Sequence, residues 1–113
     1  MLTPEQVRNV LHGALAYVGN PGTWTRLMPV QDMDGWGIDD LTDPHACAFC
    51  AFGALQRAAY DSGIANYEAA AEYVISTTLG MRVSRLIWIN DSWFWWNGRG
   101  KVLRILEEAL AAA

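Results

Sequence analysis

The chain has 113 residues, of which 52% are hydrophobic and 18% charged, and its formal net charge at pH 7 is −4. This length suits a single domain, residues 1–113, with its own core, and the hydrophobic content argues against intrinsic disorder. The acidic balance argues against a general nucleic-acid binder, because such a protein needs a basic face to displace counterions from phosphates.

The first predicted helix has a clear start and a clear end. Thr3, Pro4 and Gln6 form a capping-box pattern with proline at the first helical position. Apolar residues then recur at helical spacing as far as Val18, and Gly19-Asn20-Pro21-Gly22 ends the helix.

Capping signals and hydrophobic spacing predict further helices. They run from Pro44 to about Asp61, from about Asn66 to Gly80, and onward from Asn97-Gly98-Arg99-Gly100. We therefore expect a mainly α fold, a small single-domain bundle of about four helices around one core.

Two segments between the helices have other patterns. Residues 20–43 are rich in turn-forming residues and aspartate, which predicts a long acidic loop. Residues 83–96 are ambiguous, because the run Arg-Leu-Ile-Trp-Ile-Asn at 85–90 fits a short strand as well as one helical turn.

The chain has no apolar stretch long enough to span a bilayer, and its first residues lack the basic-then-apolar pattern of a signal peptide. We expect a cytoplasmic protein with no membrane association, in which Cys47 and Cys50 stay reduced.

The stretch His-Ala-Cys-Ala-Phe-Cys at 45–50 places two cysteines three residues apart beside a histidine. On a helix that starts at Pro44, Cys47 and Cys50 share the apolar face, which favours two packed core thiols. A zinc site needs four ligands, and only Cys47, Cys50, His12 and His45 are available, so we expect no metal and no cofactor. The alternative is a small cysteine-dependent enzyme, or a thiol or metal-site protein, that uses Cys47 or Cys50 with His12 or His45.

The acidic residues at 32–43 partly match a twelve-residue calcium loop. Trp36 stands where an oxygen ligand belongs and no helix precedes the segment, so a solvated turn-forming loop is the favoured interpretation. We expect this loop to make a second contribution to partner binding. The residues involved are Asp32, Asp34, Asp39 and Asp40.

Aromatic residues are concentrated between positions 88 and 96. So many rings cannot easily all point into the core, and exposed indoles next to basic residues are typical of interaction hot spots. The segment predicts a non-enzymatic protein that binds another protein. Its candidate binding residues are Trp88, Asn90, Asp91, Trp93, Trp95, Trp96, Arg99 and Lys101.

Three short motifs occur in the second half of the chain. A pattern Ala-x-x-x-Cys-Ala-x-Gly-Ala-Leu spans residues 46–55, an Asn-Asp pair stands at 90–91, and a Gly-Arg pair stands at 98–99. On these motifs the chain resembles an uncharacterised family of small bacteriophage and bacterial proteins with a domain of unknown function, over about residues 30–112.

The match departs from the family pattern at two positions. Ile89 separates Trp88 from the Asn-Asp pair, and Gly100 stands where a capping threonine is usual. The resemblance singles out Cys50 over Cys47 and implies a phage or prophage setting. We therefore expect a phage-encoded inhibitor or modulator of a host or defence protein, acting in the host cytoplasm.

Overall fold

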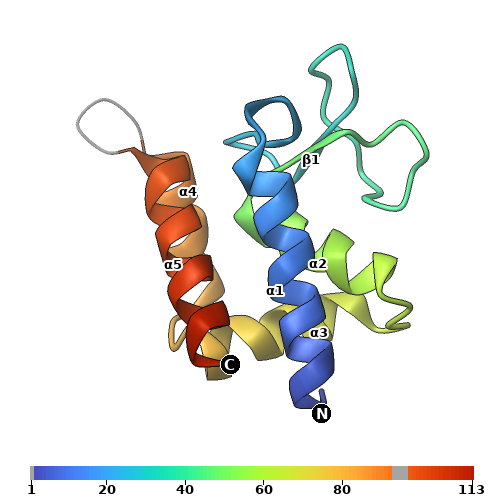
Figure 1. The fold of residues 1–113 in the computed structure, drawn as a ribbon. Helices are drawn as coiled ribbons and strands as arrows, with labels where there is room; N and C mark the ends of the chain where they lie inside the picture. The colour runs from blue at the N-terminus through green and yellow to red at the C-terminus, as the bar shows by residue number, and fades with distance from the viewer. Residues whose placement is uncertain (1, 93–96) are drawn as a thin grey trace.

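The computed structural model describes residues 2–92 and 97–113, and these residues are mainly helical (Figure 1), which confirms the predicted fold class. The described α-helices are α1 (Pro4–Gly19), α2 (Ala51–Asp61), α3 (Tyr67–Tyr73), α4 (Val83–Asp91) and α5 (Gly98–Ala112). A 3-10 turn η1 (Pro21–Thr23) follows α1, and α3 continues into a π-helical segment η2 (Val74–Thr78). Two short strands, β1 (Val30–Gln31) and β2 (Ala48–Phe49), pair antiparallel with Val30 opposite Phe49.

Helix α1 begins as its sequence predicts. The Thr3 hydroxyl accepts a hydrogen bond from the Gln6 amide at 3.1 Å, and the Gln6 side chain accepts one from the Thr3 amide at 2.9 Å. The predicted capping box and first helix are therefore confirmed, because both orphan amides are satisfied by local side chains.

Helices α1 and α2 pack closely at the centre of the core. A Cβ atom on Gly13 of α1 would lie 2.7 Å from the Cβ of Ala58 on α2. The two helix backbones are therefore so close that a residue larger than glycine does not fit at position 13. The other helices add their apolar faces around this pair, with α4 and α5 side by side and α3 crossing below (Figure 1). The fully buried large apolar side chains are Phe49, Leu11, Leu55, Ile75, Leu86, Leu106, Val10, Val18, Val74 and Val102.

The second helix begins at Ala51, so its predicted start at Pro44 is wrong. Asp43 and Pro44 instead open a turn, in which the Ala46 amide donates to the Asp43 carbonyl at 3.0 Å and the His45 amide to the Asp43 carboxylate at 2.8 Å. An aspartate before a proline satisfies the amides of a tight turn as well as those of a helix start. The chain then extends into β2 before α2 begins.

Two segments contain more regular secondary structure than the sequence predicted, namely the expected loop at 20–43 and the described part of the ambiguous segment 83–96. Residues 20–43 are not one long loop, because they include η1 and β1. Residues 83–91 form helix α4, which buries Leu86 and Asn90, one turn apart, on its inner face. The described helices therefore exceed the expected four. The third predicted helix is present as α3 and η2, and it stops before Gly80, whose φ of +67° favours glycine.

Within residues 2–92 and 97–113, no helix combines the length and the apolar character needed to cross a membrane.

Candidate binding surfaces and the network beneath them

Asn90, at the C-terminal end of α4, is a fully buried hydrogen-bond hub. Its side-chain oxygen accepts from the Trp24 indole at 2.8 Å and from the Ala51 amide at 2.9 Å. Its side-chain nitrogen donates to the Thr25 carbonyl and to the Asp91 carboxylate, each at 3.1 Å. One side chain thus ties α4 to the start of α2 and to the segment after η1. With no exposed surface, Asn90 cannot contact a partner, so it does not belong to a binding surface.

Asp91 fixes the segment that follows η1. Its carboxylate accepts a hydrogen bond from the Leu27 amide at 2.9 Å. Leu27 has a φ of +70°, which is costly for a residue with a Cβ atom, and its side chain is exposed. This hydrogen bond to Asp91 helps to hold the strained backbone of Leu27, so the carboxylate has a structural partner inside the chain.

Arg99, at the start of α5, serves the end of α1. Its guanidinium donates to the Val18 carbonyl at 2.8 Å and to the Gly19 carbonyl at 2.5 Å. The last turn of α1 has no basic residue of its own, so a cation from α5 satisfies its terminal carbonyls and complements its dipole.

The glycines of the family motifs stand at close backbone approaches. A Cβ atom on Gly53 would lie 2.2 Å from the Pro29 carbonyl oxygen, and one on Gly98 would lie 2.6 Å from that of Ile89. Larger residues do not fit without movement of the backbone. Packing and hydrogen bonding therefore explain the residues at five positions that carry the family resemblance, namely Gly53, Asn90, Asp91, Gly98 and Arg99.

Cys50 is buried and caps α2. Its sulfur accepts a hydrogen bond from the Gly53 amide at 3.3 Å, and burial raises the pKa of the Cys50 thiol. The prediction that Cys47 and Cys50 share the apolar face of one helix is wrong, because Cys47 precedes β2 and is only partly buried. Both cysteines are free. Burial disfavours the thiolate, so Cys50 is unsuited to act as a nucleophile.

The two histidines are exposed. The His45 ring nitrogen Nδ1 lies 3.0 Å from the Asp43 carboxylate, and its side chain retains 85% of its accessible surface. His45 and Cys47 border the same hollow of about 330 Å³, beside Asp32 and Asp34. In the part of the chain that the structure describes, no three His, Cys, Asp or Glu side chains are placed to hold a metal ion together.

The aspartates of the predicted acidic loop mostly stabilise turns. Asp32 accepts hydrogen bonds from the Asp34 and Trp36 amides at 2.9 and 3.0 Å. Asp40 accepts from the amide and the hydroxyl of Thr42, which lowers the pKa of the Asp40 carboxyl. Asp34, Asp39 and Asp40 are exposed.

Trp88 lies on the outer side of α4 and is 56% exposed. The Arg85 guanidinium carbon lies 5.8 Å from the centre of its indole ring, which is within cation–π range. The two residues border a hollow of about 120 Å³. We call its lining the Trp88 surface, which consists of Arg85, Trp88, Ile89, Ser92 and Lys101. The other indoles predicted to bind, Trp93, Trp95 and Trp96, lie outside the described residues.

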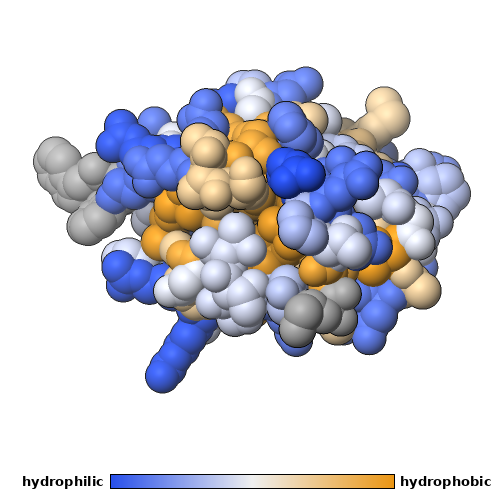
Figure 2. All heavy atoms as spheres, turned by 60° about the horizontal axis from the view of Figure 1, so that its bottom comes forward, coloured by the Kyte–Doolittle hydropathy of each residue, from blue (hydrophilic) through white to orange (hydrophobic). Residues whose placement is uncertain are grey.

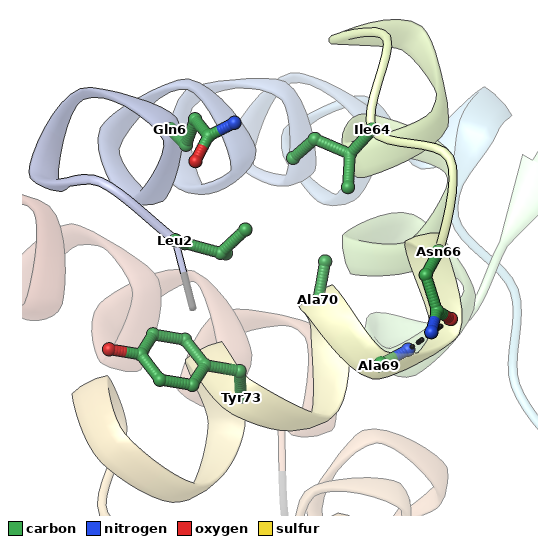
Figure 3. Close-up of a pocket in the computed structure, with 7 residues that line it drawn as sticks. All are labelled: Leu2, Gln6, Ile64, Asn66, Ala69, Ala70 and Tyr73. Carbon is green, nitrogen blue, oxygen red and sulfur yellow. Dashed lines mark hydrogen bonds between the residues drawn. The ribbon is translucent and has the colours of Figure 1, made fainter.

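A larger hollow of about 440 Å³ lies between the first turn of α1 and α3 (Figure 3), and apolar side chains gather near the middle of this end of the molecule (Figure 2). The amide oxygens of Gln6 and Asn66 at its edge already accept helix-capping hydrogen bonds. No charged side chain lines the hollow, so it lacks the polar groups that usually orient a ligand.

A family model described as a family of unknown function (DUF6197) matches residues 2–112 of the chain. The chain belongs to this family. No curated protein and no solved structure matches the chain. The expectation of an uncharacterised family is therefore confirmed.

Proposed function

We propose that this member of the family is a non-enzymatic binding protein that docks on another protein through its Trp88 surface. The observation that carries the proposal is an indole left 56% exposed on the outer side of α4, with an arginine within cation–π range of its ring. Tryptophan and arginine are the residues most enriched in interface hot spots.

The local charge supports this choice of surface. Residues 82–104 contain Arg82, Arg85, Arg99, Lys101 and Arg104 against a single acid, Asp91. Asp91 and Arg99 are engaged in the internal network, whereas Arg82, Arg85 and Arg104 are exposed. Ion pairs between described side chains join His45 to Asp43 and Arg57 to Asp61, away from this surface. A partner with carboxylates around an apolar side chain would complement it.

The proposed setting is the cytoplasm, and for a phage-encoded protein the cytoplasm of the host. The resemblance to small phage and bacterial proteins supports a role as an inhibitor or modulator of a host or defence protein. The net charge of −4 supports a protein partner over nucleic acid.

The test is capture of partners from host lysate by tagged protein. Trp88→Ala should abolish capture while the thermal melting curve stays close to that of the unmodified protein, because the indole is more than half exposed. Tyr60→Ala is the matched control, since Tyr60 is a 43% exposed aromatic residue on α2. Equal loss in both variants, or full capture by Trp88→Ala, would contradict the proposed function.

A second candidate is a cysteine-dependent enzyme centred on Cys47. It is favoured by the contact of Asp43 with the His45 ring and by the hollow that His45 shares with Cys47. A carboxylate that orients an imidazole beside a thiol is the arrangement that activates cysteine nucleophiles. Fast thiol labelling near neutral pH that is lost in Cys47→Ser and slowed in His45→Ala would support this candidate.

A further inference from the structure

Residues 31–37 form a tight, well-tied projection, which we call the 31–37 tip. Gln31 and Gly37 form an antiparallel bridge, and the Asp32 amide donates to the Trp36 carbonyl at 2.9 Å. The Asp32 carboxylate accepts two further amides within the turn, and Gly35 adopts a φ of +85°. The base of the tip is anchored because β1 pairs with β2. The tip is therefore held in one shape before it meets any partner.

The tip carries its apolar side chains outward. Met33 is 88% exposed and Trp36 is 72% exposed, which makes them two of the most exposed large apolar residues among those described. The exposed carboxylate of Asp34 lies between them in sequence. Preorganised apolar side chains lose little conformational entropy on binding, so such a tip is suited to insert into a small hollow.

The Trp88 surface has the complementary features. It offers a hollow of about 120 Å³, which is smaller than the cavity of roughly 150 Å³ that holds benzene and therefore suits the slim side chain of a methionine better than an indole. Basic residues border that hollow, whereas acidic residues flank the tip. The tip thus carries an apolar side chain for the hollow, and the acidic residues around it have the opposite charge to the basic residues around the hollow.

Geometry prevents the tip from reaching the Trp88 surface of its own chain. The loops between β1 and β2 project on one side of the molecule, and α4 and α5 lie on the opposite side (Figure 1). A contact between the two features therefore has to join two copies. It is also heterologous, because each copy uses a different surface, and such contacts extend into open chains unless rotation closes them into a ring.

We infer that the 31–37 tip of one copy docks on the Trp88 surface of a second copy, with Met33 in the hollow and Asp34 facing Arg85. The inference rests on the proposed function, since it makes a second copy a partner of the same binding surface. So small a contact is weak, with a dissociation constant on the order of 0.1–1 mM. Self-association at high concentration would then compete with a foreign partner for the Trp88 surface.

The experiment is sedimentation velocity over a concentration series up to about 1 mM, where association of this strength becomes visible. Met33→Lys alters the tip, Arg85→Glu alters the Trp88 surface, and Arg8→Glu makes the same charge change at an exposed position of α1. The unmodified protein and Arg8→Glu should form species that grow past the dimer, and 0.5 M salt should weaken them. Met33→Lys alone and Arg85→Glu alone should each sediment as a monomer.

Mixing the two variants is the decisive step. The intact tip of Arg85→Glu fits the intact Trp88 surface of Met33→Lys, so the mixture should give a 1:1 pair that cannot grow further. A monomeric unmodified protein, a closed symmetric dimer, variants that still associate, or a mixture that stays monomeric would each overturn the inference. If capture of a foreign partner still depends on Trp88 in those cases, the proposed function stands and only the self-association is wrong.

Discussion

Replacement of Asn90 by alanine should be among the most damaging single changes in this protein. The substitution removes one buried amide and leaves three groups without their partner, namely the Trp24 indole N–H, the Ala51 amide and the Thr25 carbonyl. None of the three can be satisfied by the alanine methyl group. The hub also links segments 39 to 66 residues apart, so its loss loosens contacts between elements rather than within one helix.

The size of the effect follows from these hydrogen bonds. A buried polar group left unsatisfied costs about 1–3 kcal/mol, and water can reach Trp24 more easily than Ala51 because Trp24 is only partly buried. We therefore expect Asn90→Ala to lower the free energy of unfolding by about 3–5 kcal/mol. That is a large fraction of the roughly 5–15 kcal/mol that stabilises an ordinary domain.

Urea unfolding followed by circular dichroism measures this loss directly. The matched control is Asn9→Ala at an exposed position inside α1, where alanine favours the helix and stability should stay equal or rise slightly. A loss below about 1 kcal/mol for Asn90→Ala would refute the reasoning, because it would mean that the buried partners find other hydrogen bonds.

Asn90→Asp separates hydrogen bonding from packing. The new carboxylate keeps the acceptor for Trp24 and Ala51 but sets a second oxygen against the Thr25 carbonyl and the Asp91 carboxylate. Burial and the neighbouring negative charge raise the pKa of the new group in the folded protein, so the variant should gain stability as the pH falls and lose it as the pH rises. A variant whose stability relative to the unmodified protein does not change with pH would contradict this account of the hub.

Three further predictions concern other parts of the fold. Gly53→Ala should lower the free energy of unfolding by about 1–3 kcal/mol in the urea assay, because the new Cβ would lie 2.2 Å from the Pro29 carbonyl oxygen. Gly19→Ala is the control and should be near neutral, because its Cβ would lie 3.8 Å from the nearest atom. Burial and a hydrogen bond to a carboxylate raise the pKa of Tyr17 from 10.0 to about 12, so the stability that this tyrosine contributes is present below pH 10 and lost as the pH rises through 12. Ultraviolet titration against Tyr17→Phe checks this, and ionisation near pH 10 would contradict it. In thiol labelling of the native protein at pH 8, Cys47 should react well before the buried Cys50, and equal rates would show that α2 opens readily.

The start of α1 could be predicted because its determinants are local. Thr3, Pro4 and Gln6 lie within four positions, and their side chains complete the cap without help from the rest of the chain. The same local signals at Asp43-Pro44 were misleading, since they fit a turn equally well. Pairing of β1 with β2, which is set by residues nearly 20 positions apart, decides that the chain extends before α2 begins.

The roles of the candidate site residues depended on contacts that a single sequence does not reveal. The aromatic and basic segment around Asn90 and Arg99 predicts binding roles for both residues, yet each has hydrogen-bond partners between 39 and 81 residues away in the chain. Trp88 shows the opposite case. Its exposure follows from the register of α4, because burial of Leu86 and Asn90 on one side turns position 88 outward.

The most direct test of the account places a photoreactive amino acid at position 92, which lines the Trp88 surface and leaves Trp88 in place, and, in a separate variant, at position 60 on α2. After irradiation in host lysate, the account predicts a covalent adduct with a foreign protein from position 92 and none from position 60, because the partner contacts the exposed indole and the arginine beside it on α4. A foreign adduct from position 60 alone, or none from position 92 at any protein concentration, would contradict the central claim that this protein binds a partner through its Trp88 surface.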